Sequence, residues 1–407
     1  MTKKQYGLTS LPVIVAALGF FVDVFDLLLF NIVRKPSLRE LGLSEDAILL
    51  RGELLLSIQM IGLVVGGIIW GILGDKKGRL KVLFGSIILY AVANIANGFV
   101  HSLPQYYIIR FIAGVGLAGE LGAGVTLTAE ILPKEKRGLA ATVIATSGVF
   151  GAVTAVLLYK IFNNWRVLYF IGGGMGLVLL LLRVTVAESG MYKSVQSSGV
   201  QKGNFLMFFN NMERFFRYMK GIFIGLPVWF TIGVLITFSD RFAKEFGVVN
   251  IEPGDAVLYQ YLGLAFGDLC AGLLSNYLKS RKKALYIFYG ILILFSVLFF
   301  TQHGSSPQQF YFICAGLGFG AGLSVLYITT SAEQFGTNLR ASASISITNM
   351  VRGFTPLMLL LFSILRNVTR NYITGAWITG MIIMTIAVTA AYFTKESFGK
   401  DLDFIEE

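Results

Sequence analysis

The sequence predicts an all-α polytopic membrane protein with twelve transmembrane helices in two pseudo-symmetric six-helix bundles. The prediction rests on composition, on the spacing of apolar runs and on motifs that recur in both halves. Of the 407 residues, 55% are hydrophobic and only 14% are charged, whereas about a quarter of the residues in a soluble domain are charged. Because so few charges cannot cover a globule of this size with water-facing side chains, most of the surface must face lipid.

Twelve apolar runs are long enough to cross a bilayer, whose hydrocarbon core requires roughly 20 helical residues. The predicted spans of the first half are 10–33, 49–73, 80–100, 105–132, 139–162 and 166–186. Those of the second half are 219–241, 255–279, 284–301, 308–332, 342–364 and 373–394. An even number of spans places both termini on one side of the membrane.

The basic residues behind the net charge of +11 cluster in short segments between apolar runs. The clusters are Lys76, Lys77, Arg79 and Lys81; Lys134, Lys136 and Arg137; and Lys279, Arg281, Lys282 and Lys283. Because basic loops stay in the cytoplasm, this bias predicts a multi-pass protein of the inner membrane with both termini cytoplasmic. No basic surface remains for nucleic acid, so the expected partners are the lipid bilayer and a small molecule.

One long polar connection divides the chain. We place an N-terminal bundle at 1–188, a linker at 189–218 and a C-terminal bundle at 219–407. Residues 204–220 mix five phenylalanines with basic residues, a pattern typical of a helix lying in the membrane interface. We interpret this amphipathic helix as a tether between the bundles.

Short motifs repeat between the two halves. Residues 71–79 (GILGDKKGR) end the second span, and 272–276 (GLLSN) end the eighth with a similar spacing of small residues. A glutamate and an arginine seven positions apart cross the loop after the fourth span at 130–137 and the loop after the tenth at 333–340. Such duplications are common in transporters, whose binding site lies between the repeats.

These motifs resemble those of the major facilitator superfamily. Residues 71–81 (GILGDKKGRLK) are similar to its signature between helices 2 and 3, 110–120 (RFIAGVGLAGE) to its fourth-helix Arg-Gly motif, and 187–189 (AES) to the Pro-Glu-Ser that closes helix 6. The resemblance covers essentially the whole chain, and the nearest groups are the metabolite–proton, sugar-porter-like and organic-anion branches. It implies a secondary transporter that works by alternating access, without a cofactor and usually as a monomer.

Residues at the helix ends beside these loops are expected to close the cytoplasmic face. Ion pairs there can form in one state of a two-state protein and break in the other. The resemblance assigns this gate to Gly74, Asp75, Gly78, Arg79, Glu130, Arg137 and Glu188, with Glu333 and Arg340 as their mirror images. The alternative is that the basic loops only set topology and that Asp75 caps a turn.

Ionisable residues inside the spans are costly and are therefore functional candidates. With a rise of about 1.5 Å per residue, Asp26 in helix 1 and Arg110 in helix 4 lie at nearly the same depth. In sugar-porter-like members an acidic residue of helix 1 pairs with the helix 4 arginine and takes the coupling proton, and 23–26 (DVFD) resembles that site. The resemblance thus implies H⁺ as the coupling ion, with Asp23 as the alternative carrier or a permanent structural pair as the alternative role.

The same depth argument brings Asp268 in helix 8 level with Arg352 in helix 11. Residues 352–356 resemble the helix 11 segment of organic-anion transporters, in which the arginine faces the substrate. Because a guanidinium can hold a carboxylate with two hydrogen bonds, we predict an anion site at Arg352. If Asp268 neutralises Arg352, the pocket favours a zwitterion or a neutral solute. Further candidates for the site are Asn349, Glu120, Trp229, Phe230, Tyr259, Tyr261 and Tyr327.

The leading interpretation is proton-coupled uptake of a small organic anion. Uptake of a zwitterionic or neutral metabolite, proton-driven drug efflux and a transporter-like receptor or sensor remain open. The helix 5 span contains Gly148 and Gly151 but no proline, which favours uptake over the exporters that carry a Gly/Pro-rich hinge there. The two histidines, His101 and His303, fall in outer loops, and the sequence has no metal-ligand cluster, nucleophile elbow or Walker motif. We therefore predict no metal site and no enzymatic activity.

Overall fold

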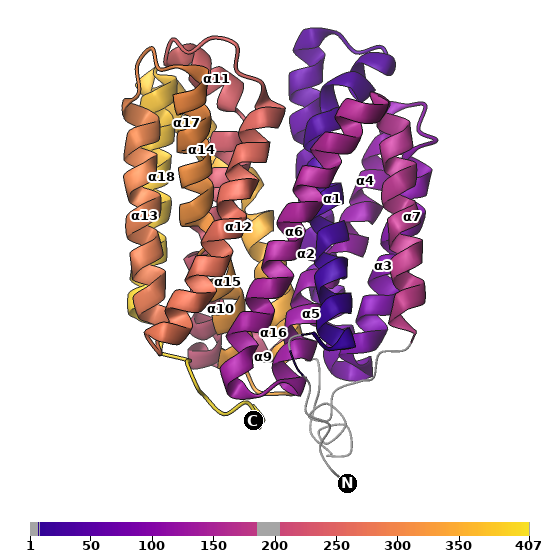
Figure 1. The fold of residues 1–407 in the computed structure, drawn as a ribbon, viewed down its shortest axis with the longest axis vertical. Helices are drawn as coiled ribbons and strands as arrows, with labels where there is room; N and C mark the ends of the chain where they lie inside the picture. Colours follow the sequence, from indigo (N-terminus) through magenta and orange to yellow (C-terminus); the bar gives the residue numbers. More distant parts are fainter. Residues whose placement is uncertain (1–6, 8, 185–203, 407) are drawn as a thin grey trace.

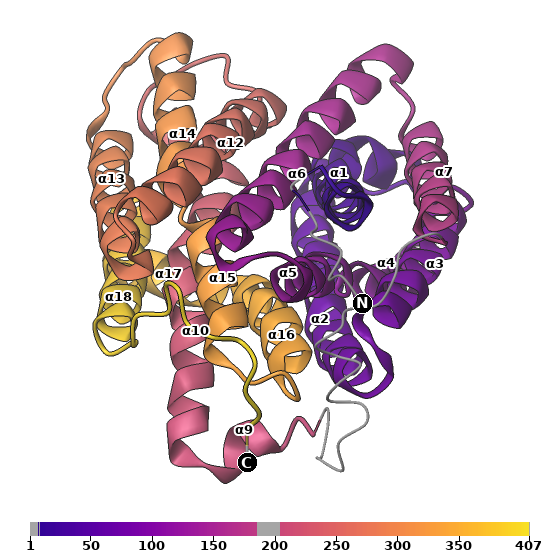
Figure 2. The ribbon, with the colours of Figure 1, turned by 60° about the horizontal axis from the view of Figure 1, so that its bottom comes forward.

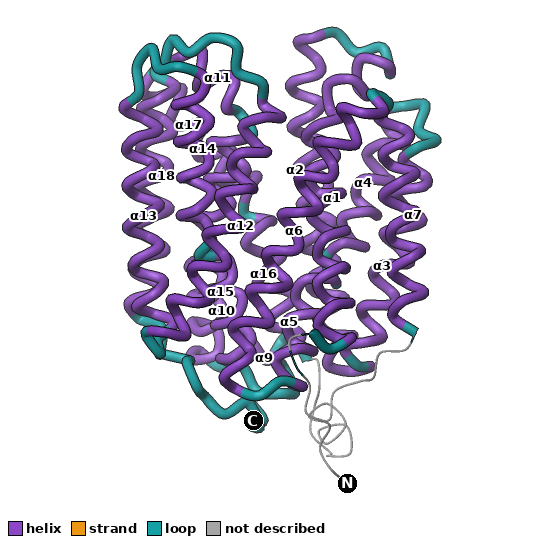
Figure 3. Tube along the Cα trace, in the orientation of Figure 1, coloured by secondary structure: helices purple, strands orange, loops and turns teal. Residues whose placement is uncertain are grey.

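The computed structural model describes residue 7, residues 9–184 and residues 204–406. In that part of the chain all regular elements are helices, and they form two bundles standing side by side (Figure 1). The described residues begin, at α1, and end, near residue 406, at the same end of the molecule, which we call the termini end. Loops gather at the termini end and at the opposite end, and the middle is almost entirely helical (Figure 3).

The N-terminal bundle follows the predicted spans closely. Its helices are α1 (Leu11–Glu40), α2 (Glu45–Lys77), α3 (Arg79–Asn97), α4 (Leu103–Leu117), α5 (Glu120–Ile131), α6 (Lys134–Phe162) and α7 (Trp165–Arg183). The fourth predicted span is divided into α4 and α5 within a glycine-rich stretch. A break of this kind leaves carbonyl groups without helical partners, so they are free to accept other hydrogen bonds.

The C-terminal bundle repeats this plan with more interruptions. Its helices are α9 (Met207–Asn210), α10 (Met212–Phe230), the π-helical segment η1 (Thr231–Ile236), α11 (Ser239–Glu245), α12 (Pro253–Tyr277), α13 (Arg281–Thr301), α14 (Pro307–Ala321), α15 (Ser324–Gln334), α16 (Arg340–Gly353), α17 (Thr355–Thr369) and α18 (Tyr372–Tyr392). The α14–α15 break in the tenth span corresponds to the α4–α5 break in the fourth. Among the described residues, 11 helices are long and apolar enough to cross a membrane, and the shorter apolar helix Thr146–Phe162 occupies the place of the remaining predicted span.

The predicted interfacial helix over 204–220 is not a separate element. The described part of the linker holds one short turn, α9, and α10 begins at Met212 and runs directly into the seventh span. Asn211 ends the connection because its side chain accepts hydrogen bonds from the backbone N–H groups of Glu213 and Arg214 at 2.8 and 3.3 Å. Of the phenylalanines of this segment, Phe208 packs inward and stacks on Tyr218 at 4.7 Å, so it covers the C-terminal bundle, whereas Phe209 and Phe216 are exposed.

Glycines let neighbouring helices touch along their backbones. A Cβ atom at Gly318 in α14 would lie 1.8 Å from the carbonyl oxygen of Gln260 in α12, and one at Gly263 in α12 would lie 1.9 Å from the carbonyl oxygen of Ala315. Small residues at such crossings are the usual means of helix association in membranes, where lipid is as apolar as the helix surface.

We expect Gly318→Ala to lower the free energy of unfolding by about 2 kcal/mol, because the added methyl group can be placed only by separating α12 and α14. Thermal unfolding of the detergent-purified protein would measure the effect. Gly290→Ala is the matched control, since a Cβ atom there meets nothing within 4 Å. Equal melting temperatures for the two variants would contradict the close packing of α12 against α14.

Candidate functional site

A buried ion pair joins the two bundles near their centre. Arg352 of α16 donates from Nη2 to Oδ2 of Asp23 in α1 at 2.9 Å, and from Nη1 to Oδ1 at 3.4 Å. The exposed fractions of the two side chains are 4% and 0%. The carboxylate therefore occupies the two-pronged position in which a guanidinium binds an anion most strongly. Arg352 thus has an acidic partner, but the partner comes from the opposite bundle.

Asp268 does not pair with Arg352. Its carboxylate accepts a hydrogen bond from Ser324 at 2.6 Å, and no ion pair to it is found among the described residues. The depth comparison placed Asp268 level with Arg352, but depth leaves the direction of each side chain around its helix undetermined. Asp23 faces Arg352 from α1 and takes the bidentate position.

A cavity of about 40 Å³ borders this pair between the bundles. Arg352 and Asp268 line it together with Trp229 and Tyr327, and the Arg352 guanidinium carbon lies 5.5 Å from the centre of the Trp229 ring. The N-terminal bundle contributes an apolar wall. The members of this wall are Phe20, Val24, Leu27, Leu121, Gly148 and Val149. The cavity thus combines one cation, one acid and aromatic surface.

Tyr259 lies outside this site. It is 43% exposed and stacks on Tyr311 with ring centres 5.1 Å apart. Tyr261, two positions later, lines the cavity instead. Residues two positions apart on a helix point about 200° apart, so only one of the two tyrosines can face inward.

A second buried pair lies wholly within the N-terminal bundle. Nη1 of Arg110 in α4 is 3.5 Å from Oδ2 of Asp26 in α1, and both side chains are fully buried. Arg110 also donates from Nη2 to the side-chain oxygen of Gln59 at 2.7 Å, and its guanidinium carbon lies 5.1 Å from the ring centre of Phe30. The Asp26–Arg110 contact expected from helix depth is present, while the coupling role of Asp26 stays a prediction. The Gln59 partner was missed, although an amide in an apolar run was a signal for it.

Glu120 and Asn349 are structural neighbours of the site and do not line the cavity. Glu120 forms a short ion pair with Arg183 of α7 and accepts a hydrogen bond from Ser86 at 2.7 Å. It also lies against α1, because a Cβ atom at Gly19 would lie 2.6 Å from Glu120 Oε2. Asn349 donates at 2.8 Å to the carbonyl oxygen of Ala118, which the α4–α5 break leaves available.

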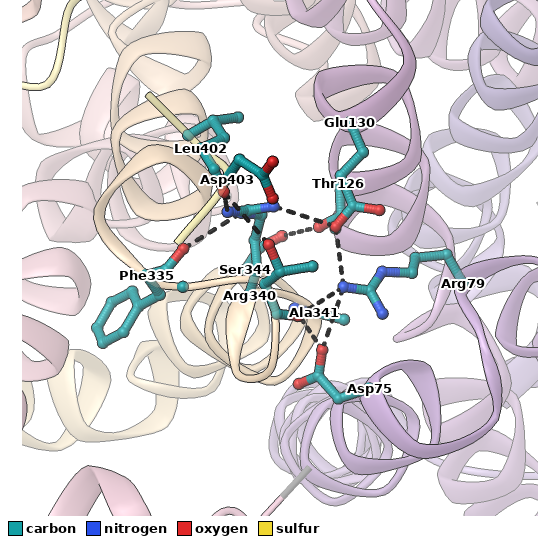
Figure 4. Close-up of polar contacts among 12 residues, drawn as sticks. Asp75, Arg79, Thr126, Glu130, Phe335, Arg340, Ala341, Ser344, Leu402 and Asp403 are labelled. Atoms are coloured by element: carbon teal, nitrogen blue, oxygen red, sulfur yellow. Dashed lines mark hydrogen bonds and ion pairs between the residues drawn. The ribbon is translucent and has the colours of Figure 1, made fainter. Parts of the chain in front are cut away.

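A second set of polar contacts joins the bundles at the termini end (Figure 4). The carboxylate of Asp75, near the end of α2, accepts hydrogen bonds from the backbone N–H groups of Ala341 and Ser342 at 3.1 and 2.8 Å. These N–H groups belong to the first turn of α16 and have no acceptor within the helix. Asp75 accepts their hydrogen bonds and lies at the positive end of the helix dipole. Asp75 therefore caps a helix of the other bundle and not a turn of its own.

Glu130 connects this contact to two arginines. Its Oε1 atom lies 2.9 Å from Nη2 of Arg79 in its own bundle and 3.2 Å from Nη1 of Arg340 in the other. Nη2 of Arg79 also lies 3.5 Å from Asp75 Oδ1 and donates to the carbonyl oxygen of Thr337 at 2.9 Å. All four charged side chains are buried, and the network is continuous from α2 to α16.

The mirrored gate is only partly symmetric. Glu333 pairs with Arg281 at 2.9 Å inside the C-terminal bundle, as Glu130 pairs with Arg79 in the N-terminal one. Arg340 instead crosses to Glu130 and donates to the carbonyl oxygens of Phe335 and Leu402. Residues 394–406, which include Leu402, cross the termini end of the C-terminal bundle (Figure 2).

Two further residues of the predicted gate are glycines whose positions suit a residue without a side chain. A Cβ atom at Gly74 would lie 3.0 Å from the Cβ of Ala341, so Gly74 permits the close approach of α2 and α16. Gly78 has a φ of 106° between α2 and α3, which a residue with a side chain rarely adopts. Glu188 and the side chain of Arg137 lie outside the described residues.

Comparisons with known proteins identify the family to which this chain belongs. The model of the Major Facilitator Superfamily matches residues 16–360. The chain belongs to the major facilitator superfamily. A Haemophilus influenzae protein with the provisional name of a metabolite transport protein is 28% identical over 88% of this chain and 90% of its own length. The benzoate transport protein of Acinetobacter baylyi is 23% identical, with 81% of this chain and 78% of the relative covered.

The fold agrees with solved structures of this superfamily. The proton:xylose symporter XylE superimposes with a TM-score of 0.74 at 16% identity, over 97% of each chain. The twelve-helix, two-bundle architecture predicted from the sequence is therefore confirmed. As a superfamily member with transporters among its relatives, the chain is a transporter and not an enzyme.

We expect Glu130→Gln to open the termini end, because it removes one partner from two buried ion pairs. Such a loss typically costs about 3 kcal/mol or more. Spin labels at Lys77→Cys and Lys279→Cys, two exposed positions on opposite bundles, would report a longer distance by double electron–electron resonance in a background without Cys270 and Cys314.

Glu333→Gln provides the matched control. It also removes a buried glutamate, but its partner Arg281 lies in the same bundle. If the label distance lengthens equally in both variants, or in neither, Glu130 does not hold the bundles together.

Proposed function

We propose that this transporter takes up a small organic anion together with a proton. The single observation behind the proposal is the position of Arg352: its guanidinium borders the cavity between the bundles and is held by the carboxylate of Asp23 with two hydrogen bonds. A substrate carboxylate has the same geometry as the Asp23 side chain and can take its place. The name of the Acinetobacter baylyi relative, a benzoate transport protein, supports an aromatic carboxylate as the substrate class.

Charge balance couples the two ligands. Arg352 and Asp23 together carry no net charge, and both are buried. If an anion entered while Asp23 stayed ionised, two negative charges would share one guanidinium in a medium of low dielectric constant, which is strongly unfavourable. If Asp23 takes up a proton as the anion binds, the site keeps the same total charge. The proton and the anion therefore stabilise each other's binding.

This mechanism makes Asp23 the first candidate for the proton carrier. Protonation of Asp23 frees Arg352 and removes a contact between α1 and α16, so it loosens the bundles where alternating access requires movement. Asp26 is the second candidate, because its pair with Arg110 lies within one bundle and reaches the bundle interface only through α1.

The positively charged loops lie at the termini end, and the positive-inside bias supports a cytoplasmic location for it. In this orientation, in the bacterial inner membrane, the Asp75–Glu130–Arg340 network closes the cytoplasmic side and would open to release the anion and the proton. We expect a monomer, with H⁺ as the coupling ion and no cofactor.

A second candidate function follows from Asp268. This acid lines the same cavity and has a hydroxyl partner, Ser324, but no ion pair in the described part of the chain. A substrate carrying both a carboxylate and an ammonium group could contact Arg352 and Asp268 together. This arrangement favours a zwitterion as the alternative substrate class.

Transport by the purified protein, reconstituted in liposomes loaded with the pH-sensitive dye pyranine, would test the proposal. We expect benzoate or a related carboxylate to acidify the lumen. Asp23→Asn should abolish acidification but retain exchange of labelled anion, because the neutral amide imitates the protonated acid and leaves Arg352 available. Arg352→Ala should abolish both signals.

Two control variants separate the roles of the charges. Arg366→Ala removes an arginine of α17, the helix that follows the Arg352 helix, from a position outside the cavity, and it should leave anion transport unchanged. Asp268→Asn should spare carboxylates but reduce transport of a zwitterion. Acidification driven only by zwitterions or neutral solutes would overturn the anion proposal, and unchanged acidification in Asp23→Asn would overturn the role of Asp23.

A further inference from the structure

A lipid-facing feature lies away from the Arg352 cavity. A groove of about 650 Å³ lies between α10 and α18, and α18 lies on the side of the C-terminal bundle away from the other bundle (Figure 2). Its walls are largely apolar, and three of the large apolar wall residues are exposed: Phe216 by 55%, Phe393 by 65% and Ile386 by 38%. In a membrane protein an apolar groove of this kind opens to lipid.

Lysines surround the end of this groove. Lys220, which lines it, donates from Nζ to the carbonyl oxygen of Phe393 at 2.9 Å, and Lys282 donates to that of Tyr392 at 2.9 Å. Lys395 is 92% exposed and lies 3.5 Å from Glu213. The positive charges of Lys282, Lys395 and Arg217 all repel that of Lys220. Cations therefore outnumber Glu213, which is the acid lining the groove.

We propose that this groove binds an anionic phospholipid, with an acyl chain between α10 and α18 and the phosphate between Lys220 and Lys395. Lysines at the ends of membrane helices lie at the level of lipid headgroups, where basic pockets between helices select anionic lipids. The apolar walls distinguish this ligand from a soluble phosphate, since they leave most of the groove without a polar partner. The site is separate from the Arg352 cavity and does not depend on the proposed substrate.

Lys220 and Lys282 also have a structural role, because they bind carbonyl groups at the C-terminal end of α18. Such carbonyls lack helical partners and carry partial negative charge. The exposed position of Lys395 is not explained by this role, and neither is the open apolar groove beside it. A lipid phosphate accounts for both features.

Native mass spectrometry of the full chain, purified with equal amounts of phosphatidylglycerol and phosphatidylcholine, would test the proposal. We expect the protein to retain phosphatidylglycerol preferentially. Lys220→Gln with Lys395→Gln should weaken that preference by roughly fivefold for each lysine removed. Lys77→Gln with Lys81→Gln removes two exposed lysines at the same end of the N-terminal bundle and should leave the preference unchanged.

Thr389→Trp provides an independent test that keeps every lysine. Thr389 is exposed and lines the groove, so the indole should fill the space of the acyl chain and reduce retention of phosphatidylglycerol. Equal preference in all variants would overturn the proposal, as would an equal loss in the Lys77/Lys81 control. Competition by inorganic phosphate with no lipid retained would overturn the acyl-chain part of the site.

Discussion

Ions buried in a bilayer must be matched by a partner of opposite charge, and this constraint organises the interior of the protein. Isolated charges in a low-dielectric medium cost far more than any single packing contact provides. The protein places such pairs at two kinds of position. Asp26–Arg110 and Glu120–Arg183 lie inside the N-terminal bundle and hold it as a unit. Asp23–Arg352 crosses between the bundles and therefore depends on how the bundles are arranged.

Among the described residues, the buried ion pairs that cross between the bundles lie at two levels. The Asp75–Glu130–Arg340 network lies at the termini end, and Asp23–Arg352 lies beside the cavity. A transporter that alternates its access must break the first level to open the termini end. In the proposed mechanism the second level is sensitive to ligands, because an anion and a proton together replace the Asp23 carboxylate. The proposed order of events links substrate binding to movement of the bundles.

Much of this architecture is predictable from the sequence, and the exceptions have a common physical cause. Apolar runs and a repeated motif identify the helices, and depth along helices 1 and 4 brings Asp26 to Arg110. Depth says nothing about the direction of a side chain around its helix, so it could not assign Asp23 to Arg352. Arg183 lies at the end of α7, where sequence alone cannot distinguish a loop residue from a buried one, yet its side chain pairs with Glu120. The aromatic residues over 204–220 are typical of an interfacial helix in sequence, and only the packing of Phe208 onto Tyr218 and Phe335 shows that this phenylalanine faces inward.

The central claim is that the substrate anion displaces the Asp23 carboxylate from Arg352 as that carboxylate becomes protonated. The most direct test is to count the protons bound with the anion, by calorimetric titration of benzoate into the purified protein in buffers of different ionisation enthalpy. At a pH where Asp23 is ionised in the free protein, the account predicts uptake of about one proton per anion bound, and none in Asp23→Asn. Anion binding by the wild-type protein without proton uptake would contradict it.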